Sequence, residues 1–411
     1  GTHGAPLGNG AYVNTIKNLG ADPENPFIVR PEVAELYEQR RNELKRIVAQ
    51  RHKEEKEWAE ANPEKAKKQS DWFAKRLPEI DWETIEHKPN AATRAGSQTI
   101  LKRLSERVEN MICSSADLCN SDKTDGFLYG TQNLKKGDFS GKFLQAGVSE
   151  LTMACCCIGI SLHGGVWAAM GTFFVFSDYM KPAIRMAALM ELPVKFIWTH
   201  DAFRVGEDGP THEPVEQEAQ IRLMEKLKNH SGKNSLLVLR PSDVHATTVC
   251  WQMAMENDDT PTALIFSRQN VADLPKGTNY KLGRKGAYLV KEVENPACIA
   301  VASGSEVSTL VSASEILQAQ GININVVSCP SEGLFFNQPE EYREKILPRN
   351  AKIFGLTAGL PVTIQSLVGN NGYVHGLDMF GFSAPYKVLD EKLGFTPEYV
   401  AEEIKQYINK K

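Results

Sequence analysis

An uncharged stretch in the middle of the chain constrains the fold more than any other feature. Residues 151–176 contain no Asp, Glu, Lys or Arg, so this segment is expected to be buried in a protein core or in a membrane. Its length allows a membrane span, but His163 and four glycines interrupt it. The pair Gly164-Gly165 divides the stretch into two parts. We therefore predict a buried helix, a turn and a buried strand, with no membrane association.

Short β-rich runs alternate with helical patterns along the rest of the chain. The β-rich runs are residues 193–199, 235–239, 262–266, 298–302 and 324–328, and helical patterns cover residues 97–111, 178–190, 213–227, 306–320 and 397–409. This alternation is typical of α/β proteins with mainly parallel sheets flanked by helices. A link at residues 275–286 separates two such units, so the sequence predicts two α/β domains. Ser303 and Glu306 have the spacing of a capping box at the start of a helix.

The composition and charge pattern exclude several classes of protein. With 42% hydrophobic and 24% charged residues, the chain has the composition of a globular protein. The net charge of −4 gives no basic excess for a nucleic-acid partner. Residues 32–80 carry interspersed charges of both signs, which indicates a solvated helical linker. The eight cysteines form no C-x-x-C pair, so a reducing, cytoplasmic location is the expectation.

The loop after the β-rich run at residues 193–199 is the most informative candidate site. His200, Asp208 and His212 lie in it, on a backbone that Gly206 and Gly209 bend. Loops at the carboxyl ends of parallel strands are where such folds place their ligands. The alternative interpretation is a tight turn with solvated charges.

Glu150 is the last charged residue before the uncharged stretch. If the following residues are buried, its carboxyl group lies at or under the surface, where a partner or a proton has to stabilise it. The alternative is an exposed acid at the N-terminus of a helix. Downstream, Phe173, Phe176 and Tyr179 form an aromatic stripe, which indicates either core packing or a pocket for a flat ring.

Four arginines lie near the expected strand and loop boundaries. They are Arg94, Arg185, Arg240 and Arg268. The guanidinium fork suits phosphate binding, and the alternative for each residue is a surface position or an ion pair.

Several motifs in this chain resemble those of transketolase, a thiamine-diphosphate enzyme. Residues 206–212 (GEDGPTH) form the most specific motif. Four others occur in the expected order: Thr93-Arg94, residues 115–118 (SADL), residues 172–176 (TFFVF) and residues 267–269 (SRQ). The resemblance extends from His3 to residues 394–397 (GFTP).

The resemblance implies a diphosphate-binding, a pyrimidine-binding and a C-terminal domain in a complete enzyme, all three α/β. For this chain it implies the tail of the first domain with a helical linker at residues 1–88, the pyrimidine-binding domain at residues 89–278, and the C-terminal domain at residues 287–411. The family's Gly-Asp-Gly metal and diphosphate motif is absent from the sequence. The resemblance implies thiamine diphosphate and Mg²⁺ as cofactors. Because the motif is absent, the metal and diphosphate ligands are expected to lie mostly outside this chain.

The resemblance also implies which residues contact the cofactor. Glu150 is expected to contact N1′ of the aminopyrimidine and so to promote deprotonation of the thiazolium carbon. Phe173, Phe176 and Tyr179 are expected to clasp the pyrimidine ring, and Asp117 to approach the cofactor.

A second set of residues is implied to contact the substrate. His3, His200 and His212 are expected to line the substrate channel, and His212 to transfer a proton at the reacting carbon. His3 and His212 thus join Glu150 as catalytic candidates. Asp208 is expected to hydrogen-bond the donor sugar. Arg94, Ser121, His200 and Arg268 are expected to hold the sugar phosphate.

Two departures from the family pattern are visible. Ser149 and Leu151 flank Glu150 where the family usually has Arg and His. The residues around Ser121 are also altered, which leaves its phosphate contact open.

The expected activity is transfer of a two-carbon ketol unit between phosphorylated sugars by a homodimer. A related thiamine-diphosphate synthase is one alternative. The other is a non-catalytic fragment, or a subunit of a split enzyme, that serves dimerisation and pyrimidine binding. Because half of the site is expected to lie outside the chain, the chain alone is expected to be inactive.

Overall fold

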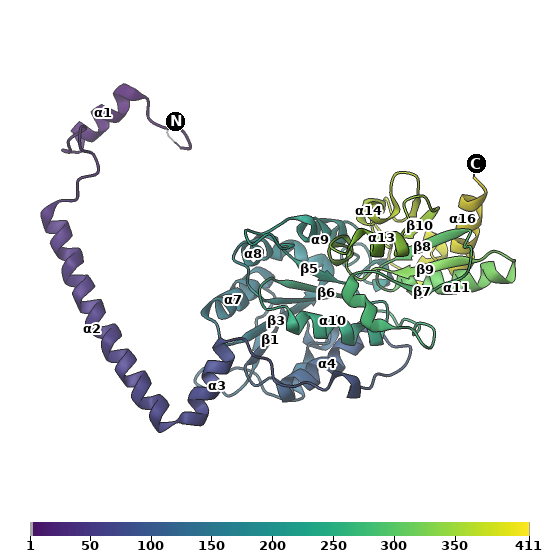
Figure 1. Ribbon diagram of the computed structural model, residues 1–411, viewed down its shortest axis with the longest axis horizontal. Coiled ribbons are helices and arrows are strands. Elements are labelled where there is room, and N and C mark those ends of the chain that lie inside the picture. Colours follow the sequence, from purple (N-terminus) through teal and green to yellow (C-terminus); the bar gives the residue numbers. More distant parts are fainter. Residues whose placement is uncertain (1–2, 411) are drawn as a thin grey trace. The chain divides into compact units, whose positions relative to one another are not determined.

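The chain divides into two compact units, residues 1–70 and residues 71–411. The computed structural model describes residues 3–410 (Figure 1). The first unit contains α1 (Asn9–Asn18), α2 (Pro31–Ala61) and the start of α3 (Pro63–Phe73).

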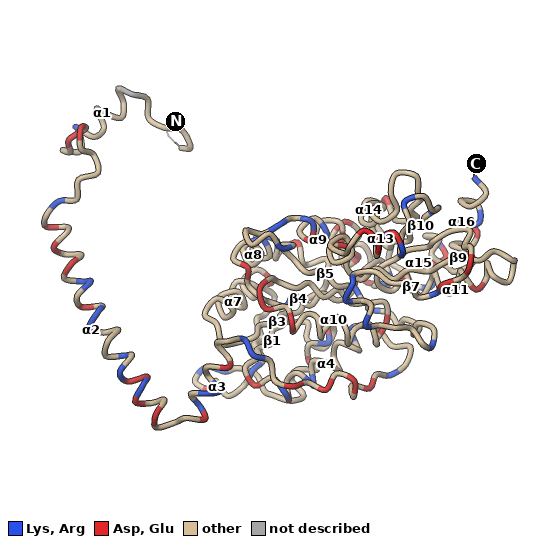
Figure 2. Tube along the Cα trace, in the orientation of Figure 1, with Lys and Arg blue, Asp and Glu red and all other residues tan. Residues whose placement is uncertain are grey.

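All residues of α2 are at least partly exposed, and charges of both signs alternate along it (Figure 2). Pairs three or four residues apart, such as Arg41–Glu38 at 2.6 Å and Lys53–Glu57 at 3.8 Å, add stability to an exposed helix. The predicted solvated helix is therefore confirmed over residues 31–73, with a break before Pro63.

Sheet A of the second unit consists of six strands. They are β1 (Met111–Ser115), β2 (Phe143–Gln145), β3 (Trp167–Phe173), β4 (Lys195–Thr199), β5 (Leu237–Leu239) and β6 (Thr262–Phe266). Their order is β2-β1-β3-β4-β6-β5, and each neighbouring pair is parallel. The carboxyl ends of all six strands therefore lie at one edge of the sheet.

Helices cover both faces of sheet A (Figure 1). One face carries α7 (Glu150–His163), α8 (Ser177–Leu189) and α9 (Gln217–Lys226), and the other carries α4 (Thr93–Arg107) and α10 (Val244–Glu256). In β4, Phe196 and Trp198 pack against the face that α7, α8 and α9 cover, and Ile197 packs against the face that α4 and α10 cover. Successive side chains of a strand point to opposite faces of the sheet. The shorter elements are α5 (Cys119–Asp122), α6 (Asp125–Leu128), η1 (Trp82–Thr84), η2 (Phe174–Phe176) and η3 (Phe203–Val205).

A second, smaller sheet follows in the chain. Its strands are β7 (Tyr288–Lys291), β8 (Cys298–Ala302), β9 (Ile324–Ser328), β10 (Ile353–Leu356) and β11 (Tyr373–His375), in the order β11-β10-β8-β9-β7. Only β7 is antiparallel to its neighbour. Its helical segments are η4 (Tyr280–Lys285), α11 (Glu306–Ala319), α12 (Glu332–Phe336), α13 (Glu340–Ile346), η5 (Pro361–Thr363), α14 (Gln365–Val368), α15 (Tyr386–Leu393) and α16 (Pro397–Asn409). The predicted fold class, α/β with mainly parallel sheets flanked by helices, is confirmed.

The uncharged stretch folds as predicted. Residues 150–163 form α7, Gly164 and Gly165 turn the chain with positive φ, and β3 is buried along its whole length. Within the part of the chain that the structure describes, no helix has the length and apolar character needed to cross a membrane.

Three predictions about elements are wrong. The helix expected at residues 97–111 ends at Arg107, and Met111 begins β1. Met111 fits the helical spacing of the apolar residues before it, although it belongs to a strand. The helix expected from residue 213 begins at Gln217. The capping box does not form, because Ser305 takes the N-cap position without a side-chain cap and Glu306 pairs with arginines instead.

Candidate active site

Most of the predicted site residues of the second unit follow strands of sheet A at its carboxyl edge. Thr199 pairs with Phe173 on one side and with Phe266 on the other. His200 directly follows β4, and Arg268 comes two residues after β6. Since the strand ends are level, the loops that carry these residues start side by side.

Arg94 joins three of these loops. Its Nη1 donates to the backbone oxygen of Ser121 at 2.7 Å and lies 3.3 Å from Nε2 of His200. The start of α4 is fixed beside the loop after β6, because Thr93 and Ser267 exchange hydrogen bonds of 2.7 and 3.0 Å. Arg94 therefore lies close enough to Arg268 for the two charges to interact.

His200 is a buried, neutral imidazole. Burial and the nearby cations Arg94 and Arg268 lower its pKa to about 2. Because an arginine can only donate, Nε2 accepts from Arg94 and the ring proton lies on Nδ1, which donates to Thr199 Oγ1 at 2.8 Å. The backbone holds this residue at φ 62°, a conformation that favours glycine.

Arg94 and Arg268 form a cationic pair with little compensation. Burial, followed by repulsion from Arg268, lowers the pKa of Arg94 to about 10, and the charge of Asp122 offsets only part of this. Two adjacent guanidinium groups beside a neutral histidine favour an anion such as phosphate.

An aromatic cluster adjoins the cationic pair. The rings of Phe173 and His200 stack at 3.6 Å, and Phe173 stacks with Phe176 at 5.9 Å and 10°. Tyr179 and His212 contact Phe176 at 6.1 and 5.5 Å. Phe173 is buried whereas Tyr179 is 62% exposed, so the cluster runs from the core to the surface. The aromatic stripe is therefore not purely core packing.

Glu150 lies at the buried start of α7. Its side chain is 8% exposed, and one oxygen accepts a long hydrogen bond of 3.4 Å from Thr172, the residue before Phe173. The interpretation of an exposed helix-terminal acid is therefore wrong. Of its unusual neighbours, Ser149 donates to the Ala146 carbonyl at 2.8 Å and Leu151 is 44% exposed.

Residues 206–212 form a tight loop. Gly206 and Gly209 adopt positive φ, and Asp208 between them is exposed. Nδ1 of His212 lies 2.8 Å from Thr211 Oγ1. The next residue, Glu213, was missed by sequence reasoning; burial raises its pKa to about 7, and the Phe382 amide offsets part of this.

The loop after β1 contains a further residue that the sequence did not reveal. Asp122 is fully buried and accepts hydrogen bonds from Ser115, at 2.7 Å, and from the backbone and hydroxyl of Thr124. It directly follows Ser121, whose backbone oxygen binds Arg94. In the same loop, Asp117 is exposed and adopts φ 64°. A single buried polar residue at the end of the four-residue helix α5 gives no periodic signal.

Three other candidates have different surroundings from the residues described above. Arg185 is exposed on α8, and Arg240 is buried in ion pairs with Asp201, Glu218 and Glu306. His3 belongs to the first unit, in the exposed segment before α1.

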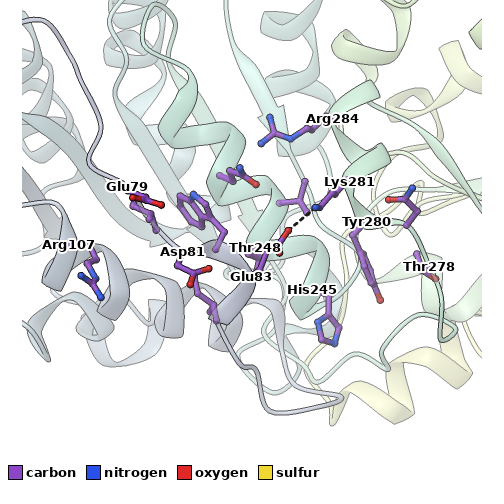
Figure 3. A pocket seen from close by; sticks show the side chains of 16 residues that line it. Glu79, Asp81, Glu83, Arg107, His245, Thr248, Thr278, Tyr280, Lys281 and Arg284 are labelled. Atoms are coloured by element: carbon purple, nitrogen blue, oxygen red, sulfur yellow. Dashed lines mark hydrogen bonds and ion pairs between the residues drawn. The ribbon is translucent and has the colours of Figure 1, made fainter.

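A cavity of about 1000 Å³ lies elsewhere, between residues 79–85, α10 and η4 (Figure 3). Arg107, His245, Tyr280 and Lys281 are among the residues that line it, and Lys281 pairs with Glu83 there at 2.8 Å. Its charged side chains are mostly solvated, so it does not share the chemistry of the half-buried pair of Arg94 and Arg268.

Comparison with known families gives three matches that together span most of the chain. The model described as "Transketolase, pyrimidine binding domain" matches residues 90–273. That of the "Transketolase-like TK C-terminal domain" matches residues 286–396, and that of the "Transketolase, thiamine diphosphate binding domain" matches residues 1–78.

Individual proteins agree with these matches. Transketolase of Staphylococcus aureus (strain MRSA252) is 38% identical over 98% of this chain, and the chain spans 61% of its length. The structure of transketolase from Leishmania mexicana superposes with a TM-score of 0.87 at 31% identity, over 98% of this chain and 58% of that one. Transketolase from Pichia stipitis, solved with sedoheptulose 7-phosphate, gives a TM-score of 0.85 at 31% identity, over 98% and 59%.

One expectation from the sequence has to be corrected. Because a thiamine-diphosphate-binding model matches residues 1–78, the expectation that the chain lacks this domain except for its tail is not supported. The expectation that the chain is an inactive fragment depended on that absence and loses its basis. The three domain matches, in family order, and the similarity to whole transketolases show that this chain belongs to the transketolase family.

Proposed function

We propose that this chain provides the pyrimidine-binding and sugar-phosphate-binding residues of a thiamine-diphosphate-dependent ketol transferase. The reaction moves a two-carbon ketol unit from a ketose phosphate, such as xylulose 5-phosphate, to an aldose phosphate. The observation that carries the proposal is the stack of His200 on Phe173 at 3.6 Å. This contact joins an aromatic cluster suited to a flat ring to an arginine pair suited to phosphate.

The residues around Glu150 fit an aminopyrimidine. A buried carboxyl group whose one protein hydrogen bond is 3.4 Å long retains the capacity to bind a ring nitrogen. We assign Glu150 to hold a proton at N1′, and Phe173, Phe176 and Tyr179 to enclose the ring. Asp117 is assigned to approach the cofactor from the neighbouring loop. When bound, thiamine diphosphate supplies the carbon nucleophile.

The arginine pair fits the sugar phosphate. Arg94, His200 and Arg268 are assigned to this group, with His200 as a neutral partner because its pKa is about 2. Ser121 is assigned to the same group, and its backbone oxygen already positions Arg94. Asp208 is assigned to a donor-sugar hydroxyl because it is exposed within the tight loop.

His212 is assigned to proton transfer at the reacting carbon. It lies at the aromatic cluster, 5.5 Å from Phe176 between ring centroids, and is partly exposed. His3 is assigned to the same substrate channel on the resemblance alone.

Further features of the proposal concern domains, metal and partners. The proposed domains are residues 1–88, 89–278 and 287–411. Mg²⁺ is proposed as the counter-ion of the cofactor's diphosphate; within residues 3–410, no group of three His, Cys, Asp or Glu side chains is arranged to hold it. Exposed apolar side chains at α7 and α8, including Leu151, Leu162 and Met186, support a homodimer. The eight free cysteines, all in the described residues, support a cytoplasmic location.

Calorimetric titration of thiamine diphosphate, with Mg²⁺ present, tests the cofactor assignment. Replacing Glu150 by Gln keeps the side-chain shape but removes the charge. Because a hydrogen bond to a charged group contributes about 1.5–3 kcal/mol, Glu150→Gln is expected to weaken binding roughly ten- to a hundredfold. The matched control is Glu294→Gln, at an exposed loop residue, which is expected to bind like the unsubstituted chain.

Two results would contradict the assignment. If the unsubstituted chain binds no thiamine diphosphate, the residues at the carboxyl edge of sheet A do not form the proposed site. If Glu150→Gln binds as tightly as Glu294→Gln, Glu150 is not the pyrimidine partner.

A further inference from the structure

Arg204 lies inside the loop that carries the substrate candidates but points away from them. It belongs to η3, between His200 and residues 206–212. Its side chain is only 6% exposed, so its charge depends on protein partners rather than on water.

All polar side-chain partners of Arg204 come from helices of the second sheet. Nε donates to Asp390 of α15 at 2.7 Å. Nη1 and Nη2 donate to Glu306 and Thr309 of α11, both at 3.3 Å. The guanidinium also lies over the rings of Phe203, at 5.3 Å, and Phe395, at 5.8 Å. One side chain therefore fastens the loop to two separate helices.

Glu306 links this contact to His200. Its second oxygen lies 2.6 Å from Nη1 of Arg240, and Nη2 of Arg240 lies 2.7 Å from Asp201, the residue after His200. A continuous chain of ion pairs thus runs from Asp390 through Arg204, Glu306 and Arg240 to Asp201. His200, with its φ of 62°, is next to the end of this chain. A strained backbone persists only where its surroundings hold it.

The rest of the loop is held in the same way. Ser383 donates to the backbone oxygen of Glu207 at 2.6 Å, and the Leu360 amide donates to Val215 at 3.1 Å. The second sheet and its connections therefore contact the loop at intervals from residue 201 to residue 215. Asp208 and His212 project from the segment between these contacts.

We propose that Arg204 is a positioning residue. Through it, the smaller sheet (β7–β11) and its helices hold the substrate loop, residues 200–212, in its binding conformation. On this view the smaller sheet and its helices act in sugar binding without contributing a residue that contacts the sugar. The inference rests on the proposed function, because that function assigns His200, Asp208 and His212 to the substrate.

Arg204→Met tests the proposal in the full chain. It removes the fork but keeps an unbranched side chain, and Glu306 retains Arg240. The control is Arg349→Met, the same change at a 68% exposed arginine of the second sheet unit that pairs with Glu340 and Glu344. Arg204→Lys, which retains the charge without the fork, is expected to give an intermediate result.

Two measurements distinguish positioning from a general loss of stability. Hydrogen exchange followed by mass spectrometry is expected to become at least about fivefold faster in peptides covering residues 200–213, and to remain unchanged in β4 and β6. In a ketol-transfer assay, KM for the sugar phosphate is expected to rise roughly tenfold while kcat changes less than about threefold. A purely structural role lowers the active fraction, and so kcat, without changing KM.

The possible outcomes separate this proposal from the proposed function. Unchanged exchange at residues 200–213, or equal effects of Arg204→Met and Arg349→Met, would overturn the positioning role. If exchange rises throughout the chain, Asp390→Asn replaces Arg204→Met and is judged by the same criteria. Asp390 is the partner of Arg204 on α15 and, at 17% exposed against 6%, is the less buried of the two. If the unsubstituted chain shows no ketol transfer, the proposed activity fails, and the exchange data alone decide whether Arg204 holds the loop.

Discussion

At the scale of single residues, the site depends on protonation states that its surroundings impose. His200 is uncharged because it is buried beside two arginines, and this leaves Nε2 as an acceptor for Arg94. A protonated ring would lose that contact and add a third positive charge. The positive charge beside His200 thus comes from the two arginines and not from the imidazole.

The charge of His200 leads to a prediction about pH. Its folded-state pKa of about 2 lies below the ordinary value of 6.5, so the unfolded chain binds more protons between these values. Stability is therefore complete above pH 6.5 and falls below it, by up to about 1.4 kcal/mol per pH unit from this group. Denaturant titrations from pH 7 to pH 5 are expected to show a shallower pH dependence for His200→Gln than for the unsubstituted chain.

The control for this titration is His163→Gln, at an exposed histidine. NMR of ¹⁵N-labelled histidine provides a direct check, in which His200 remains neutral, with its proton on Nδ1, down to pH 5. A His200 resonance that titrates near pH 6.5 would show that the ring is not shielded as described.

Two residues that the resemblance assigned to one site lie close together in the structure. His200 and Arg94 were predicted together, and the structure places them 3.3 Å apart. Arg240 was a phosphate candidate on the same general grounds and is instead buried among carboxylates. Nothing local distinguishes these two arginines, because the difference depends on partners up to about a hundred residues away.

At the scale of elements, the site depends on how closely the loop after β1 approaches β3. A Cβ atom on Gly171 would lie 2.9 Å from Asp122 Oδ2 and even closer to a methyl group of Thr124. Gly171 therefore allows residues 122–124 to lie against the strand. This places Ser121, and through its backbone oxygen Arg94, at the carboxyl edge.

Replacing Gly171 by Ala tests this close approach. Because the loop or the strand has to move, the free energy of unfolding is expected to fall by about 1–3 kcal/mol. Gly159→Ala is the matched control, since its Cβ meets nothing within 4 Å, and it is expected to stabilise the exposed face of α7 by about 0.5–1 kcal/mol. Denaturant titration measures both. Equal stability of the two variants would show that the loop does not depend on the missing side chain.

Element-scale predictions were most accurate for fully buried apolar runs. β6, β8 and the last helix have the predicted bounds, since a continuous apolar run or a clear helical period defines them. β1 was missed because it ends in the polar pair Ser114-Ser115, whose hydroxyls donate to Leu144 and Asp122 in the structure. β2 has three residues, too few to show a pattern.

At the scale of the whole molecule, the second sheet unit takes part in building the site. Buried ion pairs run from Arg204, in the loop after β4, to α11 and α15, and from Arg240, after β5, to α11. A buried charge without a partner is costly, so these pairs fix the register of the two sheets more strongly than apolar packing alone would. The sequence predicted two α/β units but assigned the second no contact with the substrate loop.

Ketol transfer from xylulose 5-phosphate to ribose 5-phosphate, with thiamine diphosphate and Mg²⁺ supplied, tests the central claim most directly. The account predicts turnover by the unsubstituted chain and by Glu294→Gln. It predicts at least a roughly hundredfold loss of kcat in Glu150→Gln, because removing a positioned acid–base group typically costs 10²–10⁴-fold. Absence of turnover in the unsubstituted chain, or full turnover in Glu150→Gln, would contradict the account.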